Sequence, residues 1–262
     1  MNLDELIAGI RKSKNYSPLY PPLIERICRE EFFKYKKDKE KLKAVKNRLH
    51  IIYGAFFPAS TKDINCADEA RLLKLHASTN ERLPSVEDFY KFISDSINAL
   101  EIESILDVGC GFNPFSLPYI RAKLPNLKSY CALDIDVRLS EMLNLYFERS
   151  GLPKLADCID IISENPAQKA DIAFLFKIIP TIENCKKGRA FELIEHIREN
   201  CAAKYIAATF PVKTLCGRNK GMAENYAAFF EKNIDYENFA VLAKNTVGNE
   251  LVYILENNIN RF

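Results

Sequence analysis

The chain has 262 residues, of which 48% are hydrophobic, and a formal net charge of +2. This apolar content is enough for a real core, which excludes a chain disordered throughout. No run of about 18 uninterrupted apolar residues occurs, and the N-terminus MNLDELIAGIRKSK lacks the basic-then-apolar order of a signal peptide, so we expect a cytoplasmic protein without a membrane span. Eight cysteines stand singly without a CxxC pair, which predicts neither a metal site nor a disulfide framework.

The first hundred residues show helical periodicity. Apolar residues recur three or four positions apart in the stretches 3–13, 21–37, 42–57 and 85–100. The charge is most uneven between Arg26 and Arg48, where ten basic side chains stand against four acidic ones. Such a run suits contact with phosphates, but a hydrated helix face with ion pairs four residues apart would explain it equally well. We therefore expect a helical N-terminal region over residues 1–100.

From residue 101 to 262 strand-like and helix-like segments alternate. Strands are predicted at 103–108, 129–133, 158–162, 171–176 and 204–210, with helices at 137–150 and 188–200 among them. This alternation indicates an α/β fold with a parallel, Rossmann-like sheet. The final stretch, 239–255, reads as two β-rich runs joined by a turn at Gly248-Asn249, which predicts a C-terminal antiparallel hairpin at the sheet edge.

The stretch SILDVGCGFNPFSLPYI predicts a ligand site. A strand ends near Asp107, the chain turns through Gly109 and Gly111, and a helical pattern follows, so that backbone N–H groups can approach a ligand closely. Proline at position 114, where a dinucleotide site has its third glycine, disfavours NAD, and no G-K-[ST] phosphate loop follows. Asp134, in ALDID at the end of the next strand, suits ribose hydroxyls. The bend therefore favours an adenosine-bearing ligand without a pyrophosphate, and an ordinary strand-to-helix turn is the alternative.

The spacing of Asp107, Gly109 and Gly111 resembles the first motif of class I S-adenosylmethionine methyltransferases, with Asn113 where many members keep a third glycine. Asparagine tolerates left-handed backbone, which would explain that exchange. Four segments, LHASTNERL (75–83), GCGFNPFSLPY (109–119), LFKIIPTIE (175–183) and FPVKTLCGRNKGMAENYAAFFE (210–231), resemble the aminoglycoside-resistance 16S rRNA methyltransferases, which modify the 7-position nitrogen of a guanine in the decoding site. The similarity spans most of the chain. It implies an rRNA-docking region over 1–100 and a methyltransferase domain over 101–262.

The same resemblance assigns cofactor roles to His76, Ser78, Arg82, Asp107, Gly109, Gly111, Asp134 and Asp160. Of these, the first three would reach the methionine carboxylate, the next three would shape the methionine end of the pocket, and the last two would bind the ribose and the adenine amino group. Three alternatives stay open: Ser78 caps a helix, His76 packs in the core, and Asp160 is a solvated turn carboxylate.

Methylation at this guanine nitrogen needs little from side chains. The nitrogen carries an in-plane lone pair and no proton, so alignment is required and a general base is not. Lys177 and Lys213 would position the target nucleotide, and Phe210, Lys213, Arg218 and Lys220 would contact RNA, although a solvated loop also explains the last three charges. We thus expect a monomeric enzyme that methylates 16S rRNA in the 30S subunit and confers aminoglycoside resistance. The alternatives are a class I methyltransferase with another RNA base or a small molecule as substrate, and a ribosome-binding protein without turnover.

Overall fold

The computed structural model describes residues 1–53, 68–212 and 221–258. Within these ranges seven strands form one sheet in the order β3-β2-β1-β4-β5-β7-β6. Strands β1 to β5 run parallel, whereas β7 is antiparallel to both β5 and β6. The bounds are β1 Ser104–Val108, β2 Ser129–Asp134, β3 Ala156–Cys158, β4 Ile172–Phe176, β5 Tyr205–Pro211, β6 Phe239–Val247 and β7 Glu250–Asn257. The predicted α/β fold, with its parallel sheet and C-terminal antiparallel hairpin, is confirmed.

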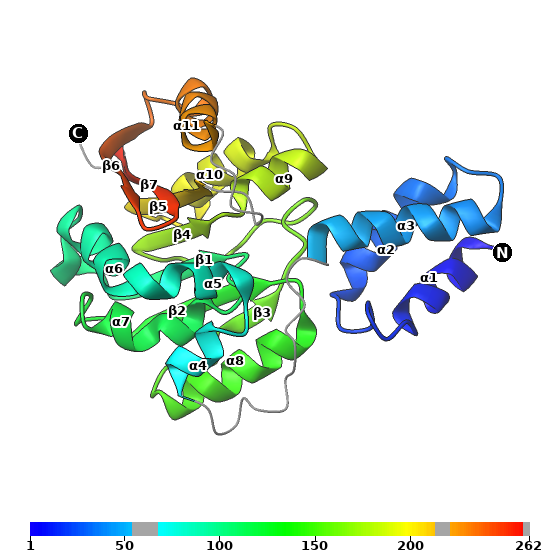
Figure 1. Ribbon diagram of the computed structural model, residues 1–262, viewed down its shortest axis with the longest axis horizontal. Helices are drawn as coiled ribbons and strands as arrows, with labels where there is room; N and C mark the ends of the chain where they lie inside the picture. The colour runs from blue at the N-terminus through cyan, green and yellow to red at the C-terminus, as the bar shows by residue number, and fades with distance from the viewer. Residues whose placement is uncertain (54–67, 213–220, 259–262) are drawn as a thin grey trace.

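Helices cover both faces of this sheet (Figure 1). Successive strand residues point to opposite faces, so Ile105 and Tyr130 lie in one core while Leu106 and Cys131 lie in the other. The first core is covered by α4, α6, α7 and α8, and the second by α9, α10 and α11. Their bounds are α4 Glu69–Leu73, α6 Val86–Asp95, α7 Leu117–Arg121, α8 Val137–Arg149, α9 Ile179–Cys185, α10 Arg189–Asn200 and α11 Met222–Asn233, and the short α5 spans Ala77–Arg82.

Residues 1–53 form a separate helical body, here called the N-terminal unit, which projects from the sheet and its helices (Figure 1). It consists of α1 Leu3–Arg11, α2 Pro21–Phe32 and α3 Asp38–Tyr53, packed around a core of their own. By contrast, Leu72, Phe89 and Ile93 belong to a core of the sheet, so α4 and α6 are part of the α/β body. The packing thus divides the chain between residues 53 and 68, and not near residue 100 as predicted, because helical periodicity reveals a buried face but not what covers it.

The N-terminal unit is attached to the loop that follows β2. The backbone N–H of Tyr20 donates to the carbonyl of Ile135 at 2.8 Å, and that of Val137 donates to Pro18 at 2.8 Å. The Tyr53 hydroxyl hydrogen-bonds the Asp136 carboxylate, and Ile135 packs against the core of the unit. The unit therefore meets the sheet at the carboxyl ends of its parallel strands, where α/β proteins bind ligands.

Two smaller expectations concern the body of the protein. The strand predicted at 158–162 is three residues long and lies at Ala156–Cys158, so Asp160 belongs to the turn that follows it. Hydrogen bonds between Asn144 and Ala156 at 2.9 and 2.8 Å fix the start of this strand on α8, a tertiary effect that local apolar content does not reveal. None of the helices in the described ranges is both long and apolar enough to cross a membrane.

Candidate active site

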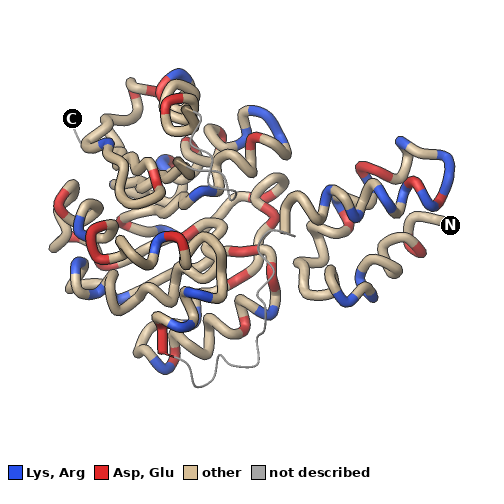
Figure 2. The backbone as a smooth tube through the Cα atoms, viewed as in Figure 1, with Lys and Arg blue, Asp and Glu red and all other residues tan. Residues whose placement is uncertain are grey.

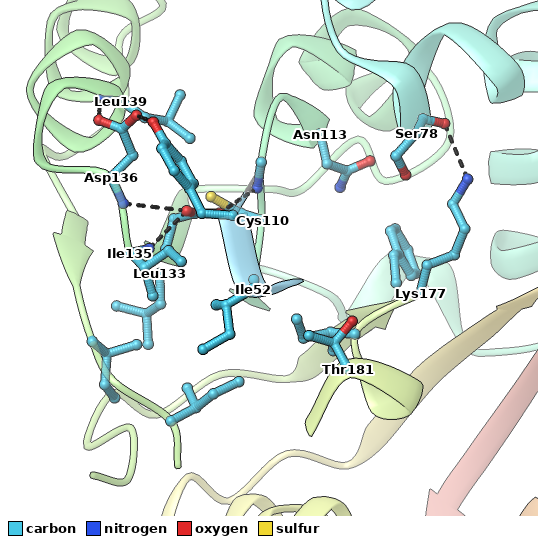
Figure 3. Close-up of a pocket in the computed structure, with 18 of the residues that line it drawn as sticks. Ile52, Ser78, Cys110, Asn113, Leu133, Ile135, Asp136, Leu139, Lys177 and Thr181 are labelled. Carbon is cyan, nitrogen blue, oxygen red and sulfur yellow. Dashed lines mark hydrogen bonds between the residues drawn. The ribbon is translucent and has the colours of Figure 1, made fainter. Parts of the chain in front are cut away.

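A pocket opens at the carboxyl ends of β1, β2 and β4, beside the N-terminal unit. The bend after β1 lines it with Gly109 and Gly111, and β2 contributes Asp134. The N-terminal unit reaches the same pocket with Leu23 and Ile52, and Figure 3 shows Ile52 between the loop after β2 and Lys177. The pocket is therefore built by two bodies with separate cores.

Glycine is required at both positions of the bend. Gly109 and Gly111 have φ values of +68° and +47°, in the left-handed region that glycine alone adopts without strain. A Cβ on Gly109 would lie 2.8 Å from Cδ1 of Ile178, and one on Gly111 would lie 3.1 Å from Cε1 of His76. The backbone of these two glycines lines the pocket, and a side chain at either position would narrow it. A ligand can therefore approach the backbone closely here.

Asp134 ties the bend to the end of β2. Its Oδ2 accepts the N–H of Gly111 at 2.8 Å, and its Oδ1 accepts the N–H groups of Ile135 at 2.7 Å and Asp136 at 3.4 Å. Burial raises the pKa of this carboxyl above its usual value, although the backbone N–H groups oppose that shift. Oδ2 makes one of these bonds and has a second lone pair with which to accept a hydroxyl from a ligand.

Asp107 lies beneath the pocket, not in its wall. It is 1% exposed, and its Oδ2 accepts hydrogen bonds from Asn113 Nδ2 at 2.9 Å and the Tyr130 hydroxyl at 2.6 Å. Burial raises the pKa of Asp107 to about 6, and these two donors oppose the shift. The Asn113 Oδ1 in turn accepts from Tyr90 at 2.8 Å and from Arg82 Nη1 at 2.5 Å. Asn113 does not have left-handed backbone, so its side chain, and not its conformational tolerance, explains its place in the motif.

Arg82 continues this buried network, which we call the pocket floor, to the last strand. Its Nε and Nη2 donate to the two carboxylate oxygens of Glu250 at 2.8 and 2.9 Å, and the side chains are 3% and 1% exposed. Burial alone would raise the pKa of Glu250, but Arg82 and Lys177 bring it below the usual value. The sequence interpretation missed Glu250. Its signal was an acidic residue opening the apolar strand ELVYIL, where a charge needs a buried partner.

Lys177 follows β4 directly and has a strained backbone. Its φ of 57° is left-handed, which costs a non-glycine residue about 1 to 2 kcal/mol. The Nζ lies 3.0 Å from Oε2 of Glu81 and 3.5 Å from Oε1 of Glu250, and donates to the Ser78 carbonyl at 3.3 Å (Figure 3). Backbone strain of this kind is common where a functional side chain is held in one orientation. The side chain of Lys177 lines the pocket.

His76 and Ser78 also line the pocket. His76 is 8% exposed and its ring stacks on Phe112 with centroids 5.3 Å apart. The imidazole therefore packs in the core, as the alternative interpretation held, and also lines the pocket. Burial, with Lys177 and Arg82 adding to it, lowers the pKa of His76 to about 4, so this imidazole is neutral at pH 7. Ser78 is the second residue of α5 and not its cap, since the N-cap position is His76.

Asp160 lines the pocket from the turn after β3, but it is 1% exposed and therefore not a solvated turn carboxylate. Its partner is Arg26 of α2, whose Nε and Nη2 donate to the two carboxylate oxygens at 2.5 and 3.1 Å. Arg26 belongs to the basic run that we expected to meet RNA. Arg48 is likewise engaged within the N-terminal unit, by Glu30 and by Glu31 at 2.9 Å.

One expected RNA contact is wrong, and three cannot be placed. Phe210 is 0% exposed, lies in β5 and stacks on Tyr226 with centroids 5.4 Å apart, so its ring fills the core and cannot stack on a base. The alternation of side chains along β5 places it in the same core as Ile206 and Ala208. Lys213, Arg218 and Lys220 lie outside the described residues.

A glycine bend after β1, an aspartate ending β2 and an antiparallel β7 between β5 and β6 together define the class I methyltransferase fold. Residues 12–254 match the ribosomal RNA methyltransferase (FmrO) family, and the chain belongs to this family. The resemblance recognised in the four sequence segments is thereby confirmed.

Relatives named for one reaction match over 96% or more of their length. The chain is 32% identical to a 16S rRNA (guanine(1405)-N(7))-methyltransferase of Serratia marcescens, over 98% of this chain and 100% of the relative. It is 29% identical to the enzyme of that name from Micromonospora rosea, over 97% and 96% of the two chains. Among solved structures, the 16S rRNA methyltransferase RmtF in complex with S-adenosyl-L-homocysteine matches with a TM-score of 0.84 and 32% identity, over 98% of this chain and 99% of that one. The 16S rRNA methylase RmtB matches with a TM-score of 0.79 and 29% identity, over 98% of this chain and 99% of that one.

Proposed function

We propose that this protein transfers the methyl group of S-adenosylmethionine to the 7-position nitrogen of a guanine in the decoding site of 16S rRNA, acting as a monomer on the 30S subunit. The observation that carries the proposal is the pocket at the carboxyl edge of the sheet, with bare glycine backbone on one side and Asp134 beside it. Relatives that match from end to end are named for this reaction.

The residues around the pocket fit this cofactor. Gly109 and Gly111 would admit its methionine part, and the remaining lone pair of Asp134 would accept a ribose hydroxyl. Arg82 uses three of its five N–H groups within the floor, which leaves two for a carboxylate at the pocket surface. S-adenosylmethionine supplies an electrophilic methyl group, and the protein's task is to align the acceptor with it.

Lys177 would position the acceptor base. Its left-handed backbone holds the ammonium at the pocket wall, and an N–H that now faces Glu81, Glu250 or the Ser78 carbonyl would turn to a phosphate or to the 6-oxygen of guanine. Because the acceptor nitrogen carries no proton, no side chain needs to remove one. The same nitrogen gains a positive charge on methylation, and a charge and a methyl group at the drug site would weaken aminoglycoside binding, so expression should raise the resistance of a sensitive bacterium.

The distal tip of the N-terminal unit supports docking on folded rRNA. Between α2 and α3 the side chain of Phe33 is 83% exposed, and lysine positions cluster along this end of the unit (Figure 2). The exposed lysines of this basic tip are Lys34, Lys36, Lys37, Lys39, Lys43 and Lys46. Lys34 lies 2.8 Å from Glu31 and Lys37 lies 3.5 Å from Glu40, but these two lysines stay 56% and 80% exposed, whereas Arg26 and Arg48 are 15% and 25% exposed. Cations bind phosphates and an exposed aromatic ring stacks on an unpaired base, so this tip, and not the less exposed Arg26 and Arg48, would contact the RNA.

The test is methyl incorporation from labelled S-adenosylmethionine into intact 30S subunits, beside naked 16S rRNA, with the product mapped by borohydride and aniline cleavage. We expect label at one cleavable guanine of the decoding region, and only with subunits. Label on naked RNA alone or on a small molecule would point to another substrate. Binding of 30S subunits without methyl transfer would point to a protein without turnover.

A further inference from the structure

The N-terminal unit contributes Leu23, Arg26, Ile52 and Tyr53 to the wall of the pocket. Leu23 and Ile52 come from α2 and α3, and they share the pocket with Ile135 and Ile178 of the α/β body. The unit has its own hydrophobic core, so the body does not need it in order to bury the sheet. The pocket, however, is complete only when the unit is seated.

Arg26 joins the two bodies at this wall. Its fork donates to both oxygens of Asp160 at 2.5 and 3.1 Å, across 134 residues of sequence, and the side chains are 15% and 2% exposed. A bidentate pair of this kind fixes orientation as well as distance, because the guanidinium and the carboxylate must be coplanar. The pair therefore sets how α2 lies against the turn after β3.

The carboxylate of Asp160 has no acceptor position left. Its Oδ1 accepts from Arg26 Nη2 and from the Ile162 N–H at 3.3 Å, and its Oδ2 accepts from Arg26 Nε and from the Ser163 hydroxyl at 3.0 Å. A carboxylate offers about four lone-pair sites, and these four bonds use them. An adenine amino group would thus have to displace Arg26 or Ser163, which makes the role implied by the sequence resemblance for Asp160 a poor fit.

We propose that Arg26 is a positioning residue for the cofactor: its pair with Asp160 seats the N-terminal unit against the pocket, so that seating of the unit and cofactor binding favour each other. The inference rests on the proposed function only in taking this pocket as the cofactor site. Coupling between two events is reciprocal, so a looser unit must weaken cofactor binding by the same factor by which the cofactor tightens the unit.

The experiment is calorimetric titration of the full chain with S-adenosylhomocysteine. Arg26→Ala should raise its Kd by roughly tenfold or more. Asp160→Asn should raise it by a similar factor, and the double variant should be no worse than either single one, because both remove one interaction. The matched control is Arg11→Ala, which removes an Arg–Glu pair of 2.6 Å lying wholly within the N-terminal unit, and its Kd should stay within about twofold of wild type.

Two further measurements separate positioning from general stability. In methylation of 30S subunits, Arg26→Ala should raise the KM for S-adenosylmethionine while kcat at saturating cofactor is largely kept. In the wild type S-adenosylhomocysteine should protect α2 and α3 from amide hydrogen exchange, and this protection should shrink in the variant. If Arg26→Ala is insoluble, Arg26→Lys is the variant to measure, because lysine keeps the charge but cannot donate two parallel hydrogen bonds to the carboxylate. A Kd several-fold higher than wild type supports the proposal, and a wild-type Kd overturns it.

The proposal is overturned if Arg26→Ala binds S-adenosylhomocysteine as tightly as wild type. It is also overturned if Asp160→Asn weakens binding much more than Arg26→Ala does, because Asp160 would then contact the cofactor directly. Failure of the proposed function looks different. A wild-type chain that binds the cofactor but does not methylate 30S subunits loses its proposed substrate while the Kd comparison among variants stands, and a wild-type chain that does not bind the cofactor overturns both.

Discussion

Two arginine–carboxylate pairs border the same pocket, and they differ in what surrounds them. Arg82 and Glu250 lie in the pocket floor, 3% and 1% exposed, inside a single α/β body. Arg26 and Asp160 lie where two bodies meet, and Arg26 retains 15% exposure. Charges within one core cannot separate without unfolding that core, whereas charges between two cores can separate while both stay folded. Changes in the floor should therefore appear as lost stability, and changes in the N-terminal unit as lost binding.

The strongest test of this contrast is Glu250→Ala. The substitution leaves the Arg82 guanidinium buried without its bidentate partner, and breaking a buried pair in this way costs about 3 to 5 kcal/mol. The free energy of unfolding, measured by urea titration without cofactor, should fall by that amount. Glu103→Ala, which breaks an exposed pair with Lys128, is the control and should cost less than about 1 kcal/mol. A loss below 1 kcal/mol for Glu250→Ala would contradict the account of the floor.

Asp134→Ala tests the pocket between the two pairs. A charged acceptor of a hydrogen bond contributes about 1.5 to 3 kcal/mol, so the Kd for S-adenosylmethionine should rise roughly 10- to 100-fold. Asp157→Ala, in the adjacent strand and exposed, should leave the Kd unchanged. Equal affinities of the two variants would remove Asp134 from the cofactor site.

His76→Gln should change how stability depends on pH. The folded-state pKa of about 4 lies below the ordinary value of 6.5, so on acidification the unfolded chain gains a proton that the folded chain refuses, and stability is lost as pH falls below 6.5. Between pH 7.5 and pH 5 this loss amounts to about 2 kcal/mol. The His76→Gln variant does not lose this free energy, because glutamine does not titrate. The unfolding free energy of the variant relative to wild type should therefore rise by that amount at pH 5, and an unchanged difference would show that His76 titrates normally.

The smallest expected effect belongs to the N-terminal unit. Phe33→Ala removes an exposed ring from the basic tip, and stacking on a base is worth about 1 to 3 kcal/mol. The affinity for 30S subunits should fall roughly fivefold or more, while the melting temperature and the Kd for S-adenosylhomocysteine stay as in wild type. Phe33→Tyr should restore binding because it keeps the ring. Equal binding by Phe33→Ala would place the RNA contact elsewhere on the unit.

Several features of the site followed from the sequence because they are local. The spacing of Asp107, Gly109 and Gly111 fixes a strand end and a left-handed turn within five residues, and both glycines have the positive φ values that such a turn needs. The position of Asp134 beside the bend could be predicted because adjacent parallel strands end at the same edge of a sheet. The hairpin at Gly248 required only two β-rich runs and a turn residue, and β6 and β7 pair across it.

The tertiary structure alone decided which charged groups meet. Arg82 and Glu250 are 168 residues apart, and Arg26 and Asp160 are 134 apart, so no local pattern connects either pair. For the same reason the basic run looked uniform, although Arg26 turns inward and the lysines near Phe33 face solvent. Short-range geometry determines turns, strand ends and buried faces. Which charged groups become partners depends on how distant segments pack together, and this packing makes one arginine of the basic run a link between two bodies.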